Sequence, residues 1–202
     1  MIYFTSDTHY QHKNICKGTS SWGKNEEGQG IQNTRDFDTL EKMNYALVKG
    51  INDHVKVEDE LWHLGDWSFG GFENIRKFRE QLNCQNINLV FGNHDHHIEN
   101  SKENIQEIFK SVQHYKELSI HGHKVCLLHY AMRVFNKSHK GAIHLFGHSH
   151  DSLPPLGKSM DVGVDVAFRM FGEYRPFSWI EIQSIMSNRG TELVDHHTEK
   201  TN

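Results

Sequence analysis

One pattern, which occurs five times along the chain, limits the possible folds more than any other feature. In each case a short apolar run is followed at once by a carboxylate, amide or imidazole side chain. The five stretches are MIYFTSDTH, LWHLGDWS, INLVFGNHD, KVCLLHY and AIHLFGHSH. Short apolar runs bounded by glycine are typical of buried strands. Because open α/β sheets build their sites at the carboxyl ends of strands, the five polar ends predict a single shared site.

Segments with helical periodicity separate these runs. In DTLEKMNYALVKGINDHV the apolar residues recur at helical spacing, and Asp38 is the expected N-cap. FENIRKFREQL repeats the pattern, and SWIEIQSIM opens with Ser178 and Glu181 at the spacing of a capping box. Strands that alternate with helices predict an α/β fold. The polar, glycine-rich stretch CKGTSSWGKNEEGQGIQNTRD predicts a long surface loop.

Length and composition indicate one globular domain. A chain of 202 residues can bury a substantial core, and no repeat or linker divides it, so we expect a single domain over residues 1–202. The net charge of -4 argues against a broad basic surface for duplex nucleic acid. No stretch approaches the roughly 18 apolar residues that span a bilayer, and the first residues lack the basic region of a signal peptide. Because its three cysteines are widely spaced and form no CxxC pair, we expect a cytoplasmic chain with reduced, mostly buried thiols.

The 17 histidines are the outlier in this composition. His148 and His150 follow an apolar run two residues apart, so their imidazoles share one face and can chelate a metal. Either of them alone could equally be a polar turn residue, but the ordered set of motifs favours a constructed site. Its ligands would be carboxylate, amide and imidazole groups without thiolate. Such a set suits Mn, Fe, Co, Ni or Zn better than Mg or Ca.

The motifs Asp-x-His, Gly-Asp, Gly-Asn-His-Asp, a lone His and Gly-His-x-His occur in that order as DTH, GD, GNHD, the His of LLHY and GHSH. In this respect the chain resembles the calcineurin-like metallophosphoesterases. The resemblance covers residues 1 to about 165, and GVDV with the following proline and helix is similar to the end of small bacterial and phage members. It implies two facing mixed β-sheets in a sandwich flanked by helices, with metals at the loop-bearing edge. One difference is that GDWSFGG lacks the charged residue that many members carry after Gly-Asp, which concerns substrate contacts rather than metal ligands.

The resemblance also implies a cofactor of two divalent transition-metal ions, Mn, Fe, Ni, Co or Zn, with Mn favoured. The first ion would be bound by Asp7, His9, Asp66 and His150. The second ion would be bound by Asp66, Asn93, His129 and His148. The carboxylate of Asp66 would bridge the two ions.

Further roles are implied beside the metals. His94 would meet the leaving-group oxygen and Asp95 would orient His94, although Asp95 fits a turn residue equally well. His12 and Asn14 follow the first motif, and Arg133 lies between two metal-binding motifs, so these three could contact the substrate. An ordinary loop position is the alternative for each of the three.

The expected activity is hydrolysis of a phosphate ester by a hydroxide that bridges the two ions. Two carboxylates against two divalent ions leave the centre positively charged, which favours an anionic substrate. No cap domain is apparent in the sequence, so we expect an open site that favours phosphodiesters such as nucleotides or nucleic-acid ends. The alternatives are a phosphomonoesterase acting on nucleotides or phosphoproteins, and a catalytically silent metal-binding scaffold. We expect no membrane association and no obligate protein partner.

Overall fold

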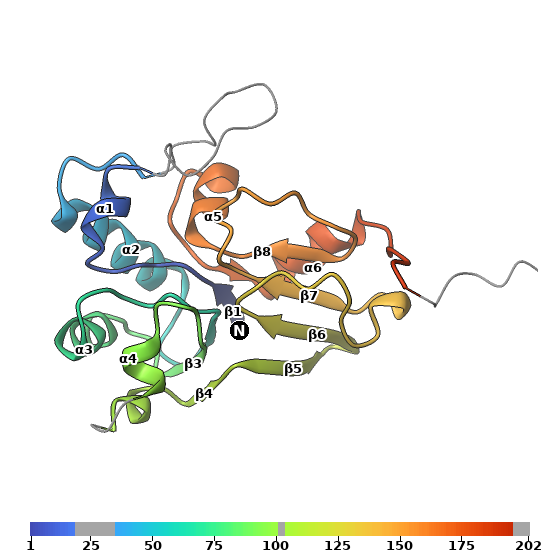
Figure 1. Cartoon of the computed structure of the whole chain (residues 1–202), viewed down its shortest axis with the longest axis horizontal. Coiled ribbons are helices and arrows are strands. Elements are labelled where there is room, and N and C mark those ends of the chain that lie inside the picture. The colour runs from blue at the N-terminus through green and yellow to red at the C-terminus, as the bar shows by residue number, and fades with distance from the viewer. Residues whose placement is uncertain (19–34, 101–103, 196–202) are drawn as a thin grey trace, which may run out of the picture.

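The computed structural model describes residues 1–18, 35–100 and 104–195. Their strands form two sheets, one in the order β4-β3-β2-β1-β9 and one in the order β5-β6-β7-β8. Figure 1 shows α2 (Leu40–His54) and α3 (Phe72–Glu80) in the half of the molecule that holds β3 and β4. In the other half, α5 (Val164–Phe171) and α6 (Trp179–Ser187) lie beside β7 and β8. The predicted α/β architecture of two mixed sheets with flanking helices is confirmed.

The first sheet is parallel except at one edge. Its parallel strands are β1 (Ile2–Thr5), β2 (Glu60–His63), β3 (Asn86–Val90) and β4 (Ser111–Gln113). β9 (Phe177–Ser178) pairs antiparallel with β1. In register, Tyr3 lies opposite Leu61, which lies opposite Ile87. The carboxyl ends of β1, β2 and β3 therefore meet at one edge, where the first three motifs begin.

The second sheet brings the last two motifs to its own edge. Its strands are β5 (Tyr115–Ile120), β6 (His123–Leu128), β7 (Ile143–Phe146) and β8 (Ser159–Asp161). β5 and β6 form an antiparallel hairpin, whereas β6, β7 and β8 are parallel. Leu127 lies opposite Leu145 in the register of β6 and β7. The loops that follow these two strands therefore start at the same level.

The main core fills the space between the two sheets. It joins them through Phe4, Trp62, Val90, Leu127 and Leu145. The opposite face of the first sheet is also buried, against α2 and α3, through Leu61, Leu89, Ile51 and Phe78. Burial of these strands on both faces explains why the sequence shows nearly continuous apolar runs rather than strict alternation.

The predicted helices are confirmed, but one N-cap differs from the prediction. The hydroxyl oxygen of Thr39 accepts a hydrogen bond from the backbone N–H of Lys42, so Thr39 caps α2 and the prediction of Asp38 is wrong. Asp38 instead forms an exposed ion pair with Lys42. Both residue types suit an N-cap, and only the backbone conformation separates them. At α6 the predicted capping box of Ser178 and Glu181 is confirmed.

The predicted surface loop falls mostly on residues 19–34, which lie outside the described residues. Its described ends agree with the prediction only in part, because Lys17 and Asp36 are exposed whereas Cys16 and Arg35 are not. Cys16 is buried at the end of α1 (Lys13–Cys16), and Arg35 is fully buried, with an exposed fraction of 0%. The three cysteines, Cys16, Cys84 and Cys126, are free and buried, as predicted.

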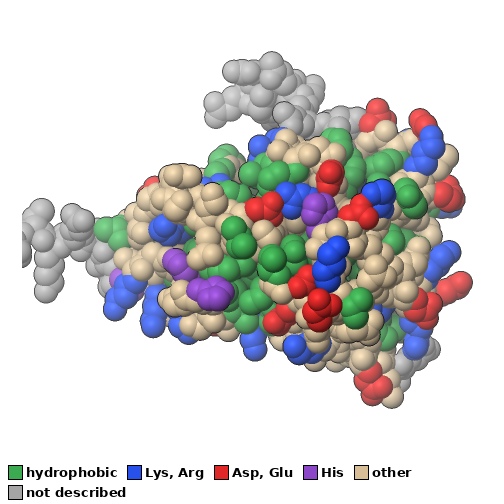
Figure 2. All heavy atoms as spheres, turned by 180° about the vertical axis from the view of Figure 1, so that it is seen from behind, with side chains coloured by type: hydrophobic (Ala, Val, Ile, Leu, Met, Phe, Trp, Pro, Cys, Tyr) green, Lys and Arg blue, Asp and Glu red, His purple; other side chains and the backbone are tan. Residues whose placement is uncertain are grey.

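The surface of the molecule carries charges of both signs. The face shown in Figure 2 carries basic and acidic side chains next to one another rather than one continuous basic patch. Within the described ranges, no helix combines the length and the apolar character that a membrane span needs. The remaining elements are the short helix α4 (His96–Glu99) and the 3-10 helices η1 (Ile105–Ile108) and η2 (Ser138–Lys140).

Candidate metal centre

The loops that carry the five motifs lie against one another at the edge where the strands end. The backbone N–H of Asp7 donates to the carbonyl of Gly65 at 2.9 Å, and that of His9 donates to the carbonyl of Asp66 at 3.0 Å. The N–H of Gly147 donates to the carbonyl of His129 at 2.8 Å. Main-chain hydrogen bonds alone thus fix loops that are far apart in the sequence to one another.

One group of potential ligands consists of Asp7, His9 and His150. One ligand atom from each lies within 4.8 Å of the other two. The Nε2 atoms of His9 and His150 are 3.3 Å apart, and Nε2 of His150 is 3.6 Å from Oδ1 of Asp7. All three side chains are buried. A carboxylate and two imidazoles that converge in this way form three sides of a cation site.

The second group consists of Asp66, His129 and His148, whose ligand atoms also lie within 4.8 Å of one another. The side-chain oxygen of Asn93 joins them, at 3.2 Å from Nε2 of His129 and 3.0 Å from Nδ1 of His148. His129 and Asp66 are buried, whereas Asn93 and His148 are exposed. The centre therefore opens to solvent on the side of this second group.

Asp66 lies between the two groups. Its Oδ2 atom is 3.4 Å from Nε2 of His9 and 3.6 Å from Nε2 of His129. Its Oδ1 atom accepts a hydrogen bond from the backbone N–H of His94 at 2.9 Å. One oxygen of Asp66 thus faces both groups, as a bridging carboxylate requires.

Most of the ligand residues adopt an unusual backbone conformation. The φ angles are 56° for Asp7, 45° for His9, 57° for Asp66, 67° for His148 and 45° for His150, all in the left-handed region. Residues with a Cβ atom occupy this region at a cost of roughly 1–2 kcal/mol each. Such strain persists where the surrounding structure enforces it, and it is concentrated at functional sites. Here the left-handed turns aim five side chains into one space.

Two glycines let the chain pass close behind the ligands. A Cβ atom at Gly92 would lie 2.2 Å from Oδ1 of Asp66. A Cβ atom at Gly147 would lie 2.4 Å from Oδ2 of Asp7 and 1.9 Å from Oγ of Ser6. The glycines of GNHD and GHSH are therefore required by the space that the two carboxylates occupy.

Burial favours the neutral form of two imidazoles of the centre, those of His9 and His148. Burial lowers the pKa of His9 well below its usual value, and burial together with His129 lowers the pKa of His148. Neutral imidazole is the form that binds a metal. His150 differs, because Asp7 and Asp165 outweigh the effect of burial and raise its pKa. That rise indicates a position that attracts positive charge.

The carboxylates of the centre lack a permanent positive partner. Among the described residues, the ion pairs of Asp7 and Asp66 involve histidines rather than lysine or arginine. Burial, together with the nearby Asp7, raises the pKa of Asp66. A buried carboxylate without compensating charge is unfavourable. Divalent cations would supply this charge, so the residues present fit the metals that the family pattern implies.

Hydrogen bonds behind the ligands set the direction of two imidazoles. Nδ1 of His129 is 2.7 Å from the carbonyl oxygen of Leu64, to which it donates. Nδ1 of His150 is 2.7 Å from Oδ2 of Asp165. Each contact leaves Nε2 as the acceptor atom that faces the centre, which is the usual arrangement behind histidine ligands.

His94 and Asp95 lie next to the centre but in different ways. The ring of His94 is half-buried, with its centroid 5.4 Å from that of His9. Asp95 accepts hydrogen bonds from the backbone N–H groups of Asp66, Trp67 and Gly92, at 2.8, 3.0 and 2.8 Å. Burial raises the pKa of Asp95 to about 7. Among its described contacts none reaches the imidazole of His94, so the carboxylate joins the second and third motif loops rather than orienting that ring.

Of the three predicted substrate contacts, only His12 lies beside the ligands. Its ring stacks on Phe69 at 4.0 Å between centroids and lies 6.4 Å from the ring of His94. Burial lowers the pKa of His12 to about 4. Asn14 is an exposed residue of α1. In the described part of the chain it has no hydrogen bond with any of the seven ligands.

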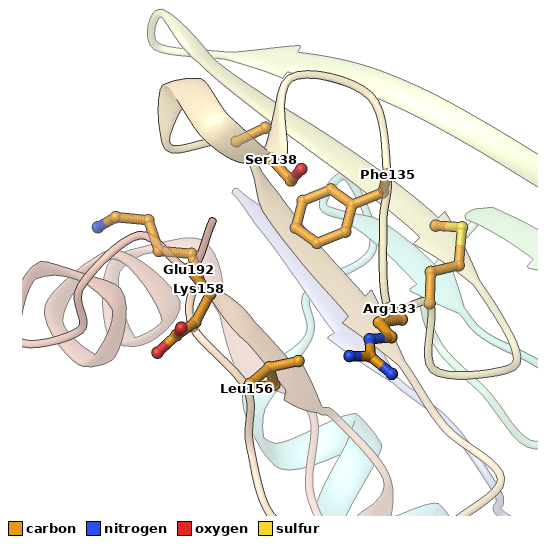
Figure 3. Close-up of a pocket in the computed structure, with 9 residues that line it drawn as sticks. Arg133, Phe135, Ser138, Leu156, Lys158 and Glu192 are labelled. Carbon is orange, nitrogen blue, oxygen red and sulfur yellow. The ribbon is translucent and has the colours of Figure 1, made fainter. Parts of the chain in front are cut away.

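Arg133 lies on the loop after β6, where it lines a pocket of about 20 Å³ with Phe135 and Leu156. Figure 3 shows its guanidinium group on the side of Leu156. Within the described ranges Arg133 forms no hydrogen bond or ion pair with a ligand residue. Its position thus gives the predicted substrate contact no direct support.

Several residues around the centre escaped the sequence interpretation. The ring of Tyr130 packs edge-on against His148 at 4.7 Å. Asp161 accepts hydrogen bonds from Oγ of Ser149 at 2.9 Å and from the N–H of Asp151 at 3.2 Å. Burial and Asp7 raise the pKa of Asp161 to about 7. The segment DVGVD begins eleven residues after the last motif, and its two carboxylates, Asp161 and Asp165, were the sequence feature that could have indicated these residues.

The chain is similar to several known proteins. A protein-family model, described as the calcineurin-like phosphoesterase superfamily domain, matches residues 1–162. An uncharacterized protein of Methanocaldococcus jannaschii is 30% identical over 186 residues, which cover 88% of this chain and 86% of that protein. The crystal structure of a protein of unknown function from Aquifex aeolicus matches with a TM-score of 0.63 and 22% identity, over 92% of this chain and 98% of that chain. An archaeal phosphodiesterase matches more distantly, with a TM-score of 0.46 and 20% identity over 80% of this chain and 82% of that chain.

Proposed function

Since the chain belongs to the calcineurin-like phosphoesterase superfamily, we propose that it hydrolyses phosphate esters with the help of two divalent transition-metal ions. The observation that best supports this proposal is the convergence of seven carboxylate, amide and imidazole side chains from five separate loops. Manganese is the favoured metal among Mn, Fe, Co, Ni and Zn, all of which suit a donor set that contains no thiolate and mixes oxygen with imidazole nitrogen. When bound, the ions would activate water and neutralise charge on the phosphate.

The protein side chains would have distinct tasks around the metals. Asp7, His9 and His150 would hold the first ion, and Asn93, His129 and His148 would hold the second, with Asp66 shared. The carboxylates reduce the positive charge of the centre without cancelling it, so a phosphate ester is still attracted. Neutral imidazoles bind without adding charge of their own.

His94 is the proposed proton donor to the leaving-group oxygen. Its backbone N–H is held by Oδ1 of Asp66, which places its ring at the rim of the centre next to His9. The ring is half-buried and thus accessible to a bound ester. For Asp95 we propose a positioning role, since its carboxylate fixes the backbone of Asp66 and Gly92.

Phosphodiesters are the proposed substrate class. Asn93 and His148 are exposed, and no described segment covers them in place of a cap, so both substituents of a diester could extend into solvent. Nucleotides or nucleic-acid ends fit this description. Hydrolysis of a monoester by the same centre is the alternative. It is less favoured, because the described residues near the centre include no arginine that is positioned to recognise a terminal phosphate.

The test compares the hydrolysis of bis(p-nitrophenyl) phosphate and p-nitrophenyl phosphate by protein supplied with Mn²⁺. We expect turnover of the diester to exceed that of the monoester. In His94→Ala, turnover should fall by about 100-fold or more, as is typical when a general acid is removed. Asp66→Asn should also lose turnover, because it removes the carboxylate that the two metal sites share. His54→Ala is the matched control, because His54 lies at the far end of α2 and pairs with Glu173. Wild-type turnover in His94→Ala would contradict the role of His94, and no turnover of either ester by the wild type would favour a silent scaffold.

A further inference from the structure

A chain of buried side chains lies behind the imidazole of His150. Oδ2 of Asp165 is 2.7 Å from Nδ1 of His150. Arg35 donates from Nε to Oδ1 of Asp165 and from Nη2 to Oδ2 of Asp165, each at 2.8 Å. Arg35 and Asp165 both have an exposed fraction of 0%. This bidentate geometry is the strongest form of an arginine–carboxylate pair.

The same guanidinium group also holds the first motif loop. Nη1 of Arg35 donates to the carbonyl oxygen of Thr8 at 3.1 Å, and Nη2 donates to the carbonyl oxygen of Asp7. Asp7 and Thr8 are fully buried. Arg35 thus connects the backbone of one ligand-bearing loop to the carboxylate that contacts a ligand on another.

The helix α5 braces the loop of the last motif at a second point. Arg169, four residues after Asp165, pairs with the carboxylate of Asp151, with Nη2 at 2.9 Å from Oδ1. Asp151 directly follows His150, and both residues have left-handed φ angles, 66° and 45°. A loop in this conformation stays in place only if its surroundings hold it. Asp165 and Arg169 are the α5 side chains that do so.

A buried ion pair is a poor choice for stability alone. Removing two charges from water costs several kcal/mol per ion, and apolar residues of similar size often replace such pairs without loss. Here, however, the pair has two further partners, a histidine of the proposed metal centre and the main chain beside Asp7. Residues that orient metal-binding histidines from behind typically change metal affinity by 10–100-fold when mutated.

The second group of ligands is held by other means. Nδ1 of His129 donates to the carbonyl of Leu64, and the carboxylate of Asp95 fixes the backbone of Asp66 and Gly92. Neither Arg35 nor Asp165 has a described hydrogen bond with these residues. Arg35 and Asp165 thus contact the first group directly and reach the second group only through the Asp7 loop, where the Asp7 carboxylate accepts from the backbone N–H of His148.

We propose that Arg35 and Asp165 are positioning residues for the first metal ion, and that they hold His150 and the Asp7 loop in the geometry that this ion needs. The inference rests on the proposed function, because it assumes that two metals bind. It adds residues outside all five motifs and assigns them to one ion of the pair. Loss of the clamp, defined here as Arg35 and Asp165, weakens the first site much more than the second site, which the clamp reaches only through the Asp7 loop.

The experiment measures metal binding in the absence of substrate. Metal-free wild type, Arg35→Gln and Asp165→Asn are titrated with Mn²⁺ by calorimetry, and the metal content after dialysis is determined by elemental analysis. We expect two bound ions in the wild type. In each variant one ion should bind about 10–100-fold more weakly, and the affinity for the other ion should change much less.

Arg175→Gln is the matched control. Arg175 is buried and forms a bidentate pair with Glu181 that contacts none of the proposed ligands. Its loss should lower thermal stability but leave both ions with wild-type affinity. Circular dichroism of each metal-free variant shows whether it is folded. If Arg35→Gln is unfolded, Arg35→Lys is used instead, because it keeps the charge and loses only the fork geometry.

A second readout requires no metal. In the ¹⁵N spectrum of the imidazoles, recorded at a pH high enough for the His150 ring to be neutral, His150 should carry its proton on Nδ1 in the wild type and lose this preference in Asp165→Asn. Two ions bound with unchanged affinity in the folded clamp variants would overturn the inference. A wild type that binds fewer than two ions would instead overturn the proposed function, so the two failures are distinguishable.

Discussion

At the scale of single residues, the centre depends on side chains that share little except their backbone conformation. Asp7, His9, Asp66, His148 and His150 come from three different motifs, yet each has a φ angle near 45–67°. A left-handed residue turns the chain sharply, so the strand ends while its next side chain points back over the sheet edge. The strain of five such residues is tolerated because the loops hydrogen-bond to one another and the glycines leave room behind them.

Gly147→Ala tests this packing. The new methyl group would overlap Oγ of Ser6 and approach Oδ2 of Asp7, so we expect a loss of about 1–3 kcal/mol in the free energy of unfolding. Urea denaturation of the metal-free protein measures it. Gly190→Ala is the control, since a Cβ atom there meets nothing within 4 Å, and its effect should stay within about 0.5 kcal/mol. Equal stability of the two variants would show that the approach of Gly147 to Asp7 is not tight.

The motif residues were predictable because their spacing and order are local signals, but their partners were not. Arg35 contacts Asp165 across 130 positions of the sequence. Arg35 lies near the end of a polar stretch that predicts a surface loop, and no neighbouring residue indicates that Arg35 is buried. Asp95 shows the opposite case, because its position next to His94 suggested a side-chain partner, whereas its contacts are backbone N–H groups.

At the scale of elements, the sequence predicted the strands that are buried on both faces. β1, β2, β3, β6 and β7 are apolar runs and end close to the predicted positions. β5 was missed, because YKELSI is mostly polar and only its end is buried. β4, β8 and β9 are two or three residues long and have no periodicity of their own. These elements are formed by pairing with their neighbours rather than by local preference.

The start of α2 gives a prediction at this scale. Thr39→Ala removes the side-chain oxygen that accepts from Lys42 N–H, so it should lower the free energy of unfolding by about 1 kcal/mol. Asp38→Ala removes only an exposed ion pair, so it should lower the free energy of unfolding less than Thr39→Ala does. Thermal denaturation of the two variants compares the N-cap that the sequence predicted with the N-cap in the structure. A larger effect at Asp38 would place the cap there after all.

In the molecule as a whole, buried polar groups near the proposed metal centre also affect the stability of the fold. His63 lies at the end of β2, fully buried, with Nε2 at 2.9 Å from the hydroxyl of Thr8. Burial lowers the pKa of His63 to about 3. Asp95 and Asp161 have the opposite shift, since burial raises the pKa of each to about 7. The fold thus holds a neutral imidazole and two carboxyl groups that resist ionisation within one small region.

His63 predicts a specific dependence of stability on pH. The unfolded chain binds a proton on this histidine near pH 6.5, whereas the native state binds it only near pH 3. The stabilisation is therefore complete above pH 6.5 and is lost as the pH falls towards 3, by up to about 1.4 kcal/mol per pH unit. Denaturation of metal-free wild type and His63→Gln between pH 7 and 4 isolates this effect from those of Asp95 and Asp161. Parallel curves for the two proteins would mean that His63 is not kept neutral by the fold.

In the proposed metal centre, five loops bring seven side chains around two cations. Anomalous X-ray diffraction from crystals grown with Mn²⁺ tests it most directly, because the scattering locates each metal independently of any assumption about activity. We expect two manganese peaks, one among Asp7, His9 and His150 and one among Asn93, His129 and His148, with Asp66 in contact with both. A single peak, or manganese bound elsewhere on the molecule, would contradict it.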